Sequence, residues 1–189
     1  MDRWTFGTVL LDILVVFSMA KPFRQQDYEH DKLCYDTVFK QLKDYFYIEE
    51  CHKEDYQIDC KVMLRYFDEV AMYLELEHSG VWCPQSANEP YLYPKLNLLK
   101  HKVDKYRKLD GIVLYLIFSK DLKHVRITIF KSVERNNPKT FWCRKTEGSY
   151  EADFYQINPN APYTKVIKTD NLERFLLLIA ENYLKQKKD

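Results

Sequence analysis

The sequence has few glycines, no low-complexity tract, and no long apolar run outside its first 20 residues. It contains four glycines in 189 residues, with 46% hydrophobic and 30% charged residues. This balance excludes a disordered chain, a collagen-like fibre and a polytopic membrane protein. The length predicts one domain with enough residues to bury a core.

Signatures of catalysis and of glycosylation are missing as well. The chain has no P-loop and no GxGxxG, HExxH or GxSxG motif, and its five histidines are scattered. No asparagine is followed by Ser or Thr two residues on, so no N-linked glycan is expected. With no motif that specifies a chemistry, the sequence predicts no catalytic residue, no metal site and no cofactor. It favours a non-enzymatic protein.

The first 20 residues have the layout of a secretory signal peptide. A charged start precedes an apolar stretch at residues 5–17, and Ser18-Met19-Ala20 has the small-x-small form of a cleavage site. The stretch is interrupted by Asp12 and is too short for a transmembrane helix, so no stable membrane span is expected. We predict a cleaved signal at residues 1–20 and a secreted single domain at residues 21–189.

Five cysteines are too few for a disulfide-dense miniprotein, and no CxxC pair suggests zinc. In an oxidising compartment at least one disulfide is expected, most favourably from Cys51, Cys60 or Cys83 in the links between predicted helices. The odd number leaves one thiol free or joins two chains in a covalent dimer, and the connectivity stays open. The candidates are Cys34, Cys51, Cys60, Cys83 and Cys143.

Apolar residues in the first half of the chain recur mostly at spacings of three and four, which predicts helices. A first helix is expected over residues 33–46, a second over residues 61–77 with Asp59 as its candidate N-cap, and a third over residues 94–109. Residues 78–93, with Gly80, Pro84 and Pro90, predict a long loop.

The periodicity changes from residue 111 onward. Residues 111–118 and 125–130 are typical of paired strands, and residues 140–144, 150–157 and 163–168 add three short β candidates. A last amphipathic helix follows Asp170. The predicted fold class is α+β, with N-terminal helices, an antiparallel meander of about five strands, and a C-terminal helix packed on the sheet.

The nearly neutral total charge hides a segregation along the chain. Residues 21–93 have a net charge of −7, residues 94–145 of +10, and residues 146–189 of −1. A protein or an acidic polymer could bind the basic segment. The competing interpretation is a solvated helix face, partly neutralised by the acidic segment. The predicted partner-binding residues of this face are Lys100, Lys102, Lys105, Arg107 and Lys108.

Aromatic residues of the long loop complete the predicted contact surface. Trp82, Tyr91 and Tyr93 belong to residue types that are enriched at interface hot spots. The alternative is that these rings cap the core beneath the loop.

Nucleic acid is disfavoured as a partner, because the whole domain is not basic, no binding motif is present, and a secretory signal points to another compartment. Asp110, followed by a strand and then Lys120 or Lys131, suggests a metal-dependent nuclease but lacks a second acidic ligand. The pairs Glu49–His52 and Glu75–His78 have a di-metal spacing but lack the glutamates of two further helices.

The sequence therefore favours a secreted, non-enzymatic binding protein that acts through a basic central face and an aromatic loop. The alternative is an intracellular small enzyme or adaptor with reduced cysteines and an uncleaved N-terminal segment.

Overall fold

The computed structural model describes residues 25–51, 58–67, 69–86, 89, 96–130, 139–145, 148–158 and 164–188. The predicted signal peptide and the loop residues Tyr91 and Tyr93 lie outside this part of the chain. The elements follow in the order α2 (Gln25–Gln41), β1 (Phe46–Glu50), β2 (Cys60–Leu64), β3 (Val70–His78), β4 (Leu96–Leu99), α3 (Lys100–Tyr106), β5 (Ile112–Phe118), β6 (His124–Ile129), β7 (Lys139–Lys145), β8 (Gly148–Ile157), β9 (Thr164–Lys168), a 3-10 turn (Thr169–Asn171) and α4 (Leu172–Lys188).

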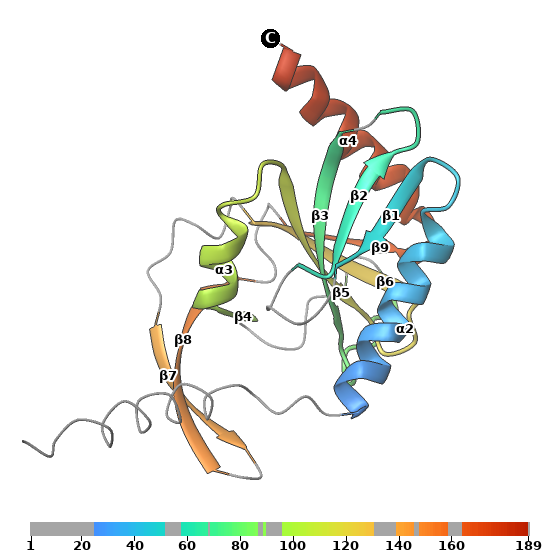
Figure 1. Ribbon diagram of the computed structural model, residues 1–189. Coiled ribbons are helices and arrows are strands. Elements are labelled where there is room, and N and C mark those ends of the chain that lie inside the picture. Colours follow the sequence, from blue (N-terminus) through green and yellow to red (C-terminus); the bar gives the residue numbers. More distant parts are fainter. Residues whose placement is uncertain are drawn as a thin grey trace, which may run out of the picture.

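The strands form two sheets (Figure 1). The main sheet has six strands in the order β1-β2-β3-β5-β6-β9, antiparallel throughout except for the parallel neighbours β3 and β5. The small sheet has the order β4-β8-β7 and is antiparallel. The α+β class and the C-terminal helix packed on the sheet are confirmed. The five predicted β segments are strands β5 to β9, divided between the two sheets.

The helix predicted over residues 61–77 is wrong, because this segment forms β2, a turn and β3. Apolar residues point to both faces of these central strands, so their spacing imitates a helical stripe. Tyr66 and Phe67, which the helix prediction placed on the apolar side, lie at the turn with 87% and 50% of their surface exposed. Asp59 precedes a strand and caps no helix.

The other two predicted helices have different bounds from those expected. The first begins earlier, at Gln25, and ends at Gln41, and Phe46 begins β1. The third is preceded by β4, so that α3 has only seven residues. Leu99 joins the two elements directly, without a side-chain cap for the helix. The position of α3 therefore depends on β4 and on the residues that it packs against.

Each face of the main sheet has its own hydrophobic core. Helices α2 and α4 cover one face, where they bury Val38, Leu172 and Leu176 against strand residues such as Leu74 and Leu116; this is the first core. On the opposite face, α3 and the small sheet bury Val103, Tyr106 and Tyr155 against Tyr115 and Ile117; this is the second core. The candidate site described below lies on the second face.

The predicted disulfide among Cys51, Cys60 and Cys83 does not occur, because each of these residues is a free thiol, as is Cys34. Cys51 belongs to the second core and Cys60 to the first, so the two side chains point to opposite faces of the sheet. Such a pair cannot form a bridge without moving the backbone. Burial raises the pKa of Cys34 to about 12, which leaves an unreactive thiol. The side chain of Cys143 is not among those that the structure describes.

None of the described helices has the length and apolar content that crossing a membrane requires.

Candidate active site

Three carboxylates lie together on the second face of the main sheet. Because side chains alternate along a strand, Glu75 and Glu77 of β3 share this face, while Leu74 and Leu76 point into the first core. Asp59 directly precedes Cys60, which pairs with Leu74, so Asp59 lies beside Glu75 on the neighbouring strand. Glu75 is 5% exposed, a degree of burial that is unusual for a glutamate.

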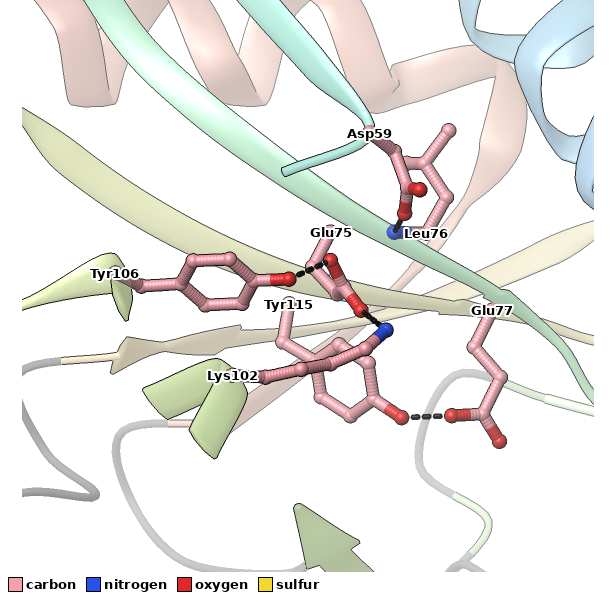
Figure 2. A network of polar contacts seen from close by, with 7 residues as sticks. All are labelled: Asp59, Glu75, Leu76, Glu77, Lys102, Tyr106 and Tyr115. Atoms are coloured by element: carbon pink, nitrogen blue, oxygen red, sulfur yellow. Dashed lines mark hydrogen bonds and ion pairs between the residues drawn. The ribbon is translucent and has the colours of Figure 1, made fainter. Parts of the chain in front are cut away.

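Helix α3 places a lysine and a tyrosine on Glu75. Lys102 forms an ion pair with one carboxylate oxygen of Glu75, and the hydroxyl of Tyr106 donates a hydrogen bond to the other (Figure 2). The two residues are four apart and therefore lie on the same side of the helix. Val103 and Tyr106 also pack in the second core, which fixes α3 over the carboxylates.

The remaining two carboxylates are held by the sheet itself. Asp59 Oδ2 accepts a hydrogen bond from the backbone N–H of Leu76 at 2.6 Å. Tyr115 of β5 lies opposite Glu75 in the strand register, and its hydroxyl group donates a hydrogen bond to Glu77 (Figure 2). We call Asp59, Glu75, Glu77 and Lys102 the acidic centre.

Burial and mutual repulsion change the proton affinities of the centre. Burial, and then the charge of Glu75, raise the pKa of Asp59 to about 8. The same two causes raise the pKa of Glu77 to about 7, against the opposing effect of Lys102. Both groups therefore titrate near neutral pH, as acid–base groups of active sites often do.

The two donors on Glu75 stay protonated. Burial by itself would lower the pKa of Lys102, but the charge and hydrogen bond of Glu75 outweigh it and the net effect raises that pKa. Burial, followed by the charge of Glu75, raises the pKa of Tyr106. Lys102 is thus a fixed cation and Tyr106 a fixed donor rather than bases.

The centre has more carboxyl groups than cationic groups. Three carboxyl groups share one ammonium group, and the negative field of Asp31 on α2 further raises the pKa of both Asp59 and Glu77. Carboxylate oxygens are the ligands preferred by hard divalent cations such as Mg²⁺. As placed, no three His, Cys, Asp or Glu side chains of the described residues are close enough to hold one ion. Lys102, Tyr106 and Tyr115 instead bind the oxygens of Glu75 and Glu77.

The structure divides the predicted basic face. Lys102 turns inward to Glu75, whereas Lys105, Arg107 and Lys108 are exposed. Lys100 pairs with Asp104 at 2.7 Å, and Arg107 pairs with the same carboxylate at 3.1 Å. The Lys102–Glu75 ion pair is a contact with the acidic segment, of the kind that the competing interpretation expected.

Of the predicted aromatic contact residues, the described part of the chain includes Trp82, which is buried. Trp82 is 1% exposed and packs in the second core, where the guanidinium of Arg126 lies 5.4 Å from its ring centroid. Tyr91 and Tyr93 lie outside the described residues.

The motifs considered from spacing alone do not build the centre. Asp110 has 88% of its side chain exposed and lies 3.8 Å from Lys187. His78 does not join Glu75, because its Nε2 lies 3.2 Å from the backbone oxygen of Lys120. His52 and Lys131 lie outside the described part of the chain.

Sequence reasoning missed Asp59, Glu75 and Glu77 as a group, because a helix was predicted where two strands occur. One signal was present: Glu75 and Glu77 alternate with Leu74 and Leu76 at the end of an apolar run. Period-two alternation of this kind indicates a strand with one polar face.

Comparisons with known proteins assign no identity. No protein family and no curated protein matches the chain. Among solved structures, a nuclease from a fusselovirus aligns over 96% of this chain and 99% of its own, at 16% sequence identity and a TM-score of 0.39. A similarity of this size assigns no function.

Proposed function

We propose that this protein is a divalent-cation-dependent nuclease whose chemistry takes place at the acidic centre. One observation supports this most strongly: Asp59, directly before β2, and Glu75 and Glu77 of β3 lie on one face of the sheet, where Lys102 pairs with Glu75. Carboxylate clusters of this kind bind the cations that assist phosphoryl transfer.

The electrostatics of the centre are compatible with a bound cation. The pKa values of Asp59 and Glu77 are raised first by burial and then by the charge of Glu75, which Lys102 only partly offsets. A divalent ion next to these carboxylates would favour their ionised forms and release protons on binding. For an ion to bind, Glu75 and Glu77 must release some of their present hydrogen bonds from Lys102, Tyr106 and Tyr115, so that the freed carboxylate oxygens can contact the ion.

The chain's own residues have separate tasks in this proposal. The bound cation would polarise the phosphoryl group and lower the pKa of a water molecule. Asp59, fixed by the N–H of Leu76, and Glu75 and Glu77 would hold the ion. Lys102 would stabilise the negative charge that develops on the phosphoryl oxygens. Tyr106 and Tyr115 are positioning residues, which orient Glu75 and Glu77 through their hydroxyl groups.

A nucleic acid fits the charge around the centre better than a small phosphoester. The inward residues Lys102 and Tyr106 alternate with exposed Lys105 and Arg107 on the same short helix, and Lys108 follows directly. Cations beside an acidic centre attract a polyanion while the carboxylates select the metal. The expectation against nucleic acid rested on the neutral average charge, the lack of a binding motif and the secretory signal, and the local separation of charge answers the first of these grounds.

Cleavage of linear and plasmid DNA and of RNA in Mg²⁺, in Mn²⁺ and in EDTA tests the proposal. We expect metal-dependent cleavage, and we expect Glu75→Gln to reduce its rate by at least about 100-fold. Even the loss of a residue that only hydrogen-bonds to a metal ligand lowers metal affinity or activity by about 10- to 100-fold. The matched control is Glu49→Gln, an exposed glutamate that pairs with Lys61 at 3.1 Å. Equal activity of both variants, or no cleavage in either metal, would refute the proposal.

Metal binding can be measured apart from activity. Isothermal titration of Mn²⁺ at pH 7.5, in buffers of different ionisation enthalpy, reports protons released per bound ion. We expect release by the wild type and weaker binding by Asp59→Asn. Binding without proton release, or unchanged binding by this variant, would place the ion elsewhere.

The non-enzymatic binding protein predicted from the sequence remains the second candidate. The exposed cations Lys105, Arg107 and Lys108 favour it, because a basic face can bind an acidic protein or polymer without any chemistry. A protein that binds heparin in a salt-sensitive way and cleaves no phosphodiester would support this candidate over the nuclease.

Secretion is a prediction that both candidates permit. Expression in a secreting eukaryotic cell, followed by N-terminal sequencing, should find protein in the medium beginning at Lys21. An intracellular product that retains residues 1–20 would contradict it.

A further inference from the structure

We infer that the small sheet and the outer side of α3 form a binding surface for duplex nucleic acid beside the acidic centre; this inference rests on the proposed nuclease function. The small sheet stands apart from the main sheet, and its β7–β8 hairpin projects away from the body of the molecule (Figure 1). We call the β4-β8-β7 sheet the arm.

The arm is joined physically to the helix that covers the centre. β4 continues into α3 at Leu99, so the arm and the helix share one stretch of backbone. The guanidinium of Arg107 lies 5.2 Å from the ring centroid of Tyr155 on β8. Asp153 and Tyr155 of β8 also influence the pKa of Lys100, which places β8 next to the start of α3. A ligand on the arm would therefore lie beside Lys102 and Glu75.

The combined surface has a basic sequence. Residues 96–108, 139–145 and 148–157 together contain eight lysines and arginines and three acidic residues. Arg144 and Lys145 stand at the far end of the hairpin, where Lys145 pairs with Gly148. Lys105 and Lys108 are exposed on and after α3. The basic positions of the sequence thus run from the last residues of β7 to α3, and such a series suits the extended charge of a nucleic-acid backbone.

The shape of the arm favours a duplex. A two-stranded β-ribbon fits the major groove of B-form DNA, whereas single strands are bound by grooves with stacking platforms. The β7–β8 hairpin is paired continuously from Lys139 and Phe154 to Lys145 and Gly148, and only its inner strand continues to β4. The hairpin can enter a groove while α3 stays at the phosphates.

Three double charge reversals of identical net change test the inference. The arm variant is Arg144→Glu with Lys145→Glu, and the helix variant is Lys105→Glu with Lys108→Glu. The control is Lys165→Glu with Lys168→Glu, two exposed lysines on β9. Affinity for a fluorescein-labelled 25-base-pair DNA duplex is measured by anisotropy in EDTA, at several salt concentrations, with a single strand of the same sequence as competitor.

We expect the arm and helix variants each to weaken duplex binding by about tenfold or more and to reduce the salt dependence by about two ion equivalents. The control should bind within about threefold of the wild type. An arm variant that binds like the control, or a wild type that prefers the single strand, would overturn the inference. A milder double variant, Arg144→Gln with Lys145→Gln, replaces the arm reversal if that reversal disturbs folding. Melting curves of every variant show whether this is the case.

Failure of this inference can be told from failure of the proposed function. If the wild type cleaves DNA and the arm variant binds the duplex with unchanged affinity, only the inference about the arm is refuted. If the wild type binds the duplex through the arm but cleaves no substrate in Mg²⁺ or Mn²⁺, the proposed nuclease function is refuted and the arm remains the binding surface.

Discussion

The two faces of the main sheet use the same strands for opposite purposes. On β3, Met72, Leu74 and Leu76 point into an apolar core beneath α2 and α4, and each is at most 7% exposed. Their neighbours Glu75 and Glu77 point to the other face, where Glu75 is buried and Glu77 is exposed. The first face supplies stability, and the second places acidic groups close to one another. Sites of function commonly give up stability in this way.

Removing one side chain from the apolar face should have the largest effect on stability. Leu74 is fully buried in the first core, so Leu74→Ala should lower the free energy of unfolding by about 2–5 kcal/mol, through lost transfer free energy and a new cavity. Urea unfolding followed by circular dichroism measures the change. The control is Tyr66→Ala, at a residue that is 87% exposed, which should change stability by less than about 0.5 kcal/mol. Similar losses in both variants would contradict the assignment of the core.

The acidic face should make the metal-free protein less stable as the pH rises. Folding raises the pKa of Asp59 to about 8 and of Glu77 to about 7, so the folded state holds protons that the unfolded state has already released. Stability should therefore fall between about pH 5.5 and pH 8.5. Melting temperatures in EDTA across this range, at constant ionic strength, measure the trend. A melting temperature that rises continuously to pH 8.5 would show that the carboxylates are better compensated than the structure indicates.

Glu77→Gln should flatten that pH dependence. The amide has no charge to desolvate, so the variant should melt higher than the wild type at pH 8.5 and close to it at pH 5.5. The proposed nuclease activity should fall at the same time, because a carboxylate is lost from the centre. A variant that is destabilised equally at both pH values would mean that packing, and not charge, decides the role of this residue.

The link between α3 and the small sheet should contribute least to stability. Arg107→Ala removes a contact with the Tyr155 ring and an exposed ion pair with Asp104, together worth about 0.5–1 kcal/mol. Thermal unfolding of this variant, compared with Lys165→Ala on β9, isolates the contact. A loss above about 2 kcal/mol would show that the small sheet unfolds together with the main sheet.

Reductant should have no effect on the first core. Cys34 and Cys60 are buried free thiols there, so the melting temperature should be the same with and without dithiothreitol. Thiol titration of the unfolded protein checks the count. A clear drop in reductant would restore the disulfide predicted from the sequence.

Local patterns predicted much of the fold and little of the site. The paired strands β5 and β6 and the helix α4 follow their periodicity closely, since each buries one continuous apolar stripe or run. The segment containing β2 and β3 was predicted as a helix, because strands buried on both faces lose the alternation that identifies them. Lys102 was correctly seen as part of a basic helix, but its inward direction depends on a glutamate 27 residues earlier.

The sequence by itself determined the α+β class, the late strands, the closing helix and the segregation of charge, because these depend on spacing within a few residues. Only the tertiary structure decided that Asp59, Glu75, Glu77 and Lys102 meet. Their contact requires the register of β2 on β3 and the docking of α3 on the opposite face from α2 and α4. Register and docking result from packing between distant segments, so no local pattern can encode which charged residues are brought together.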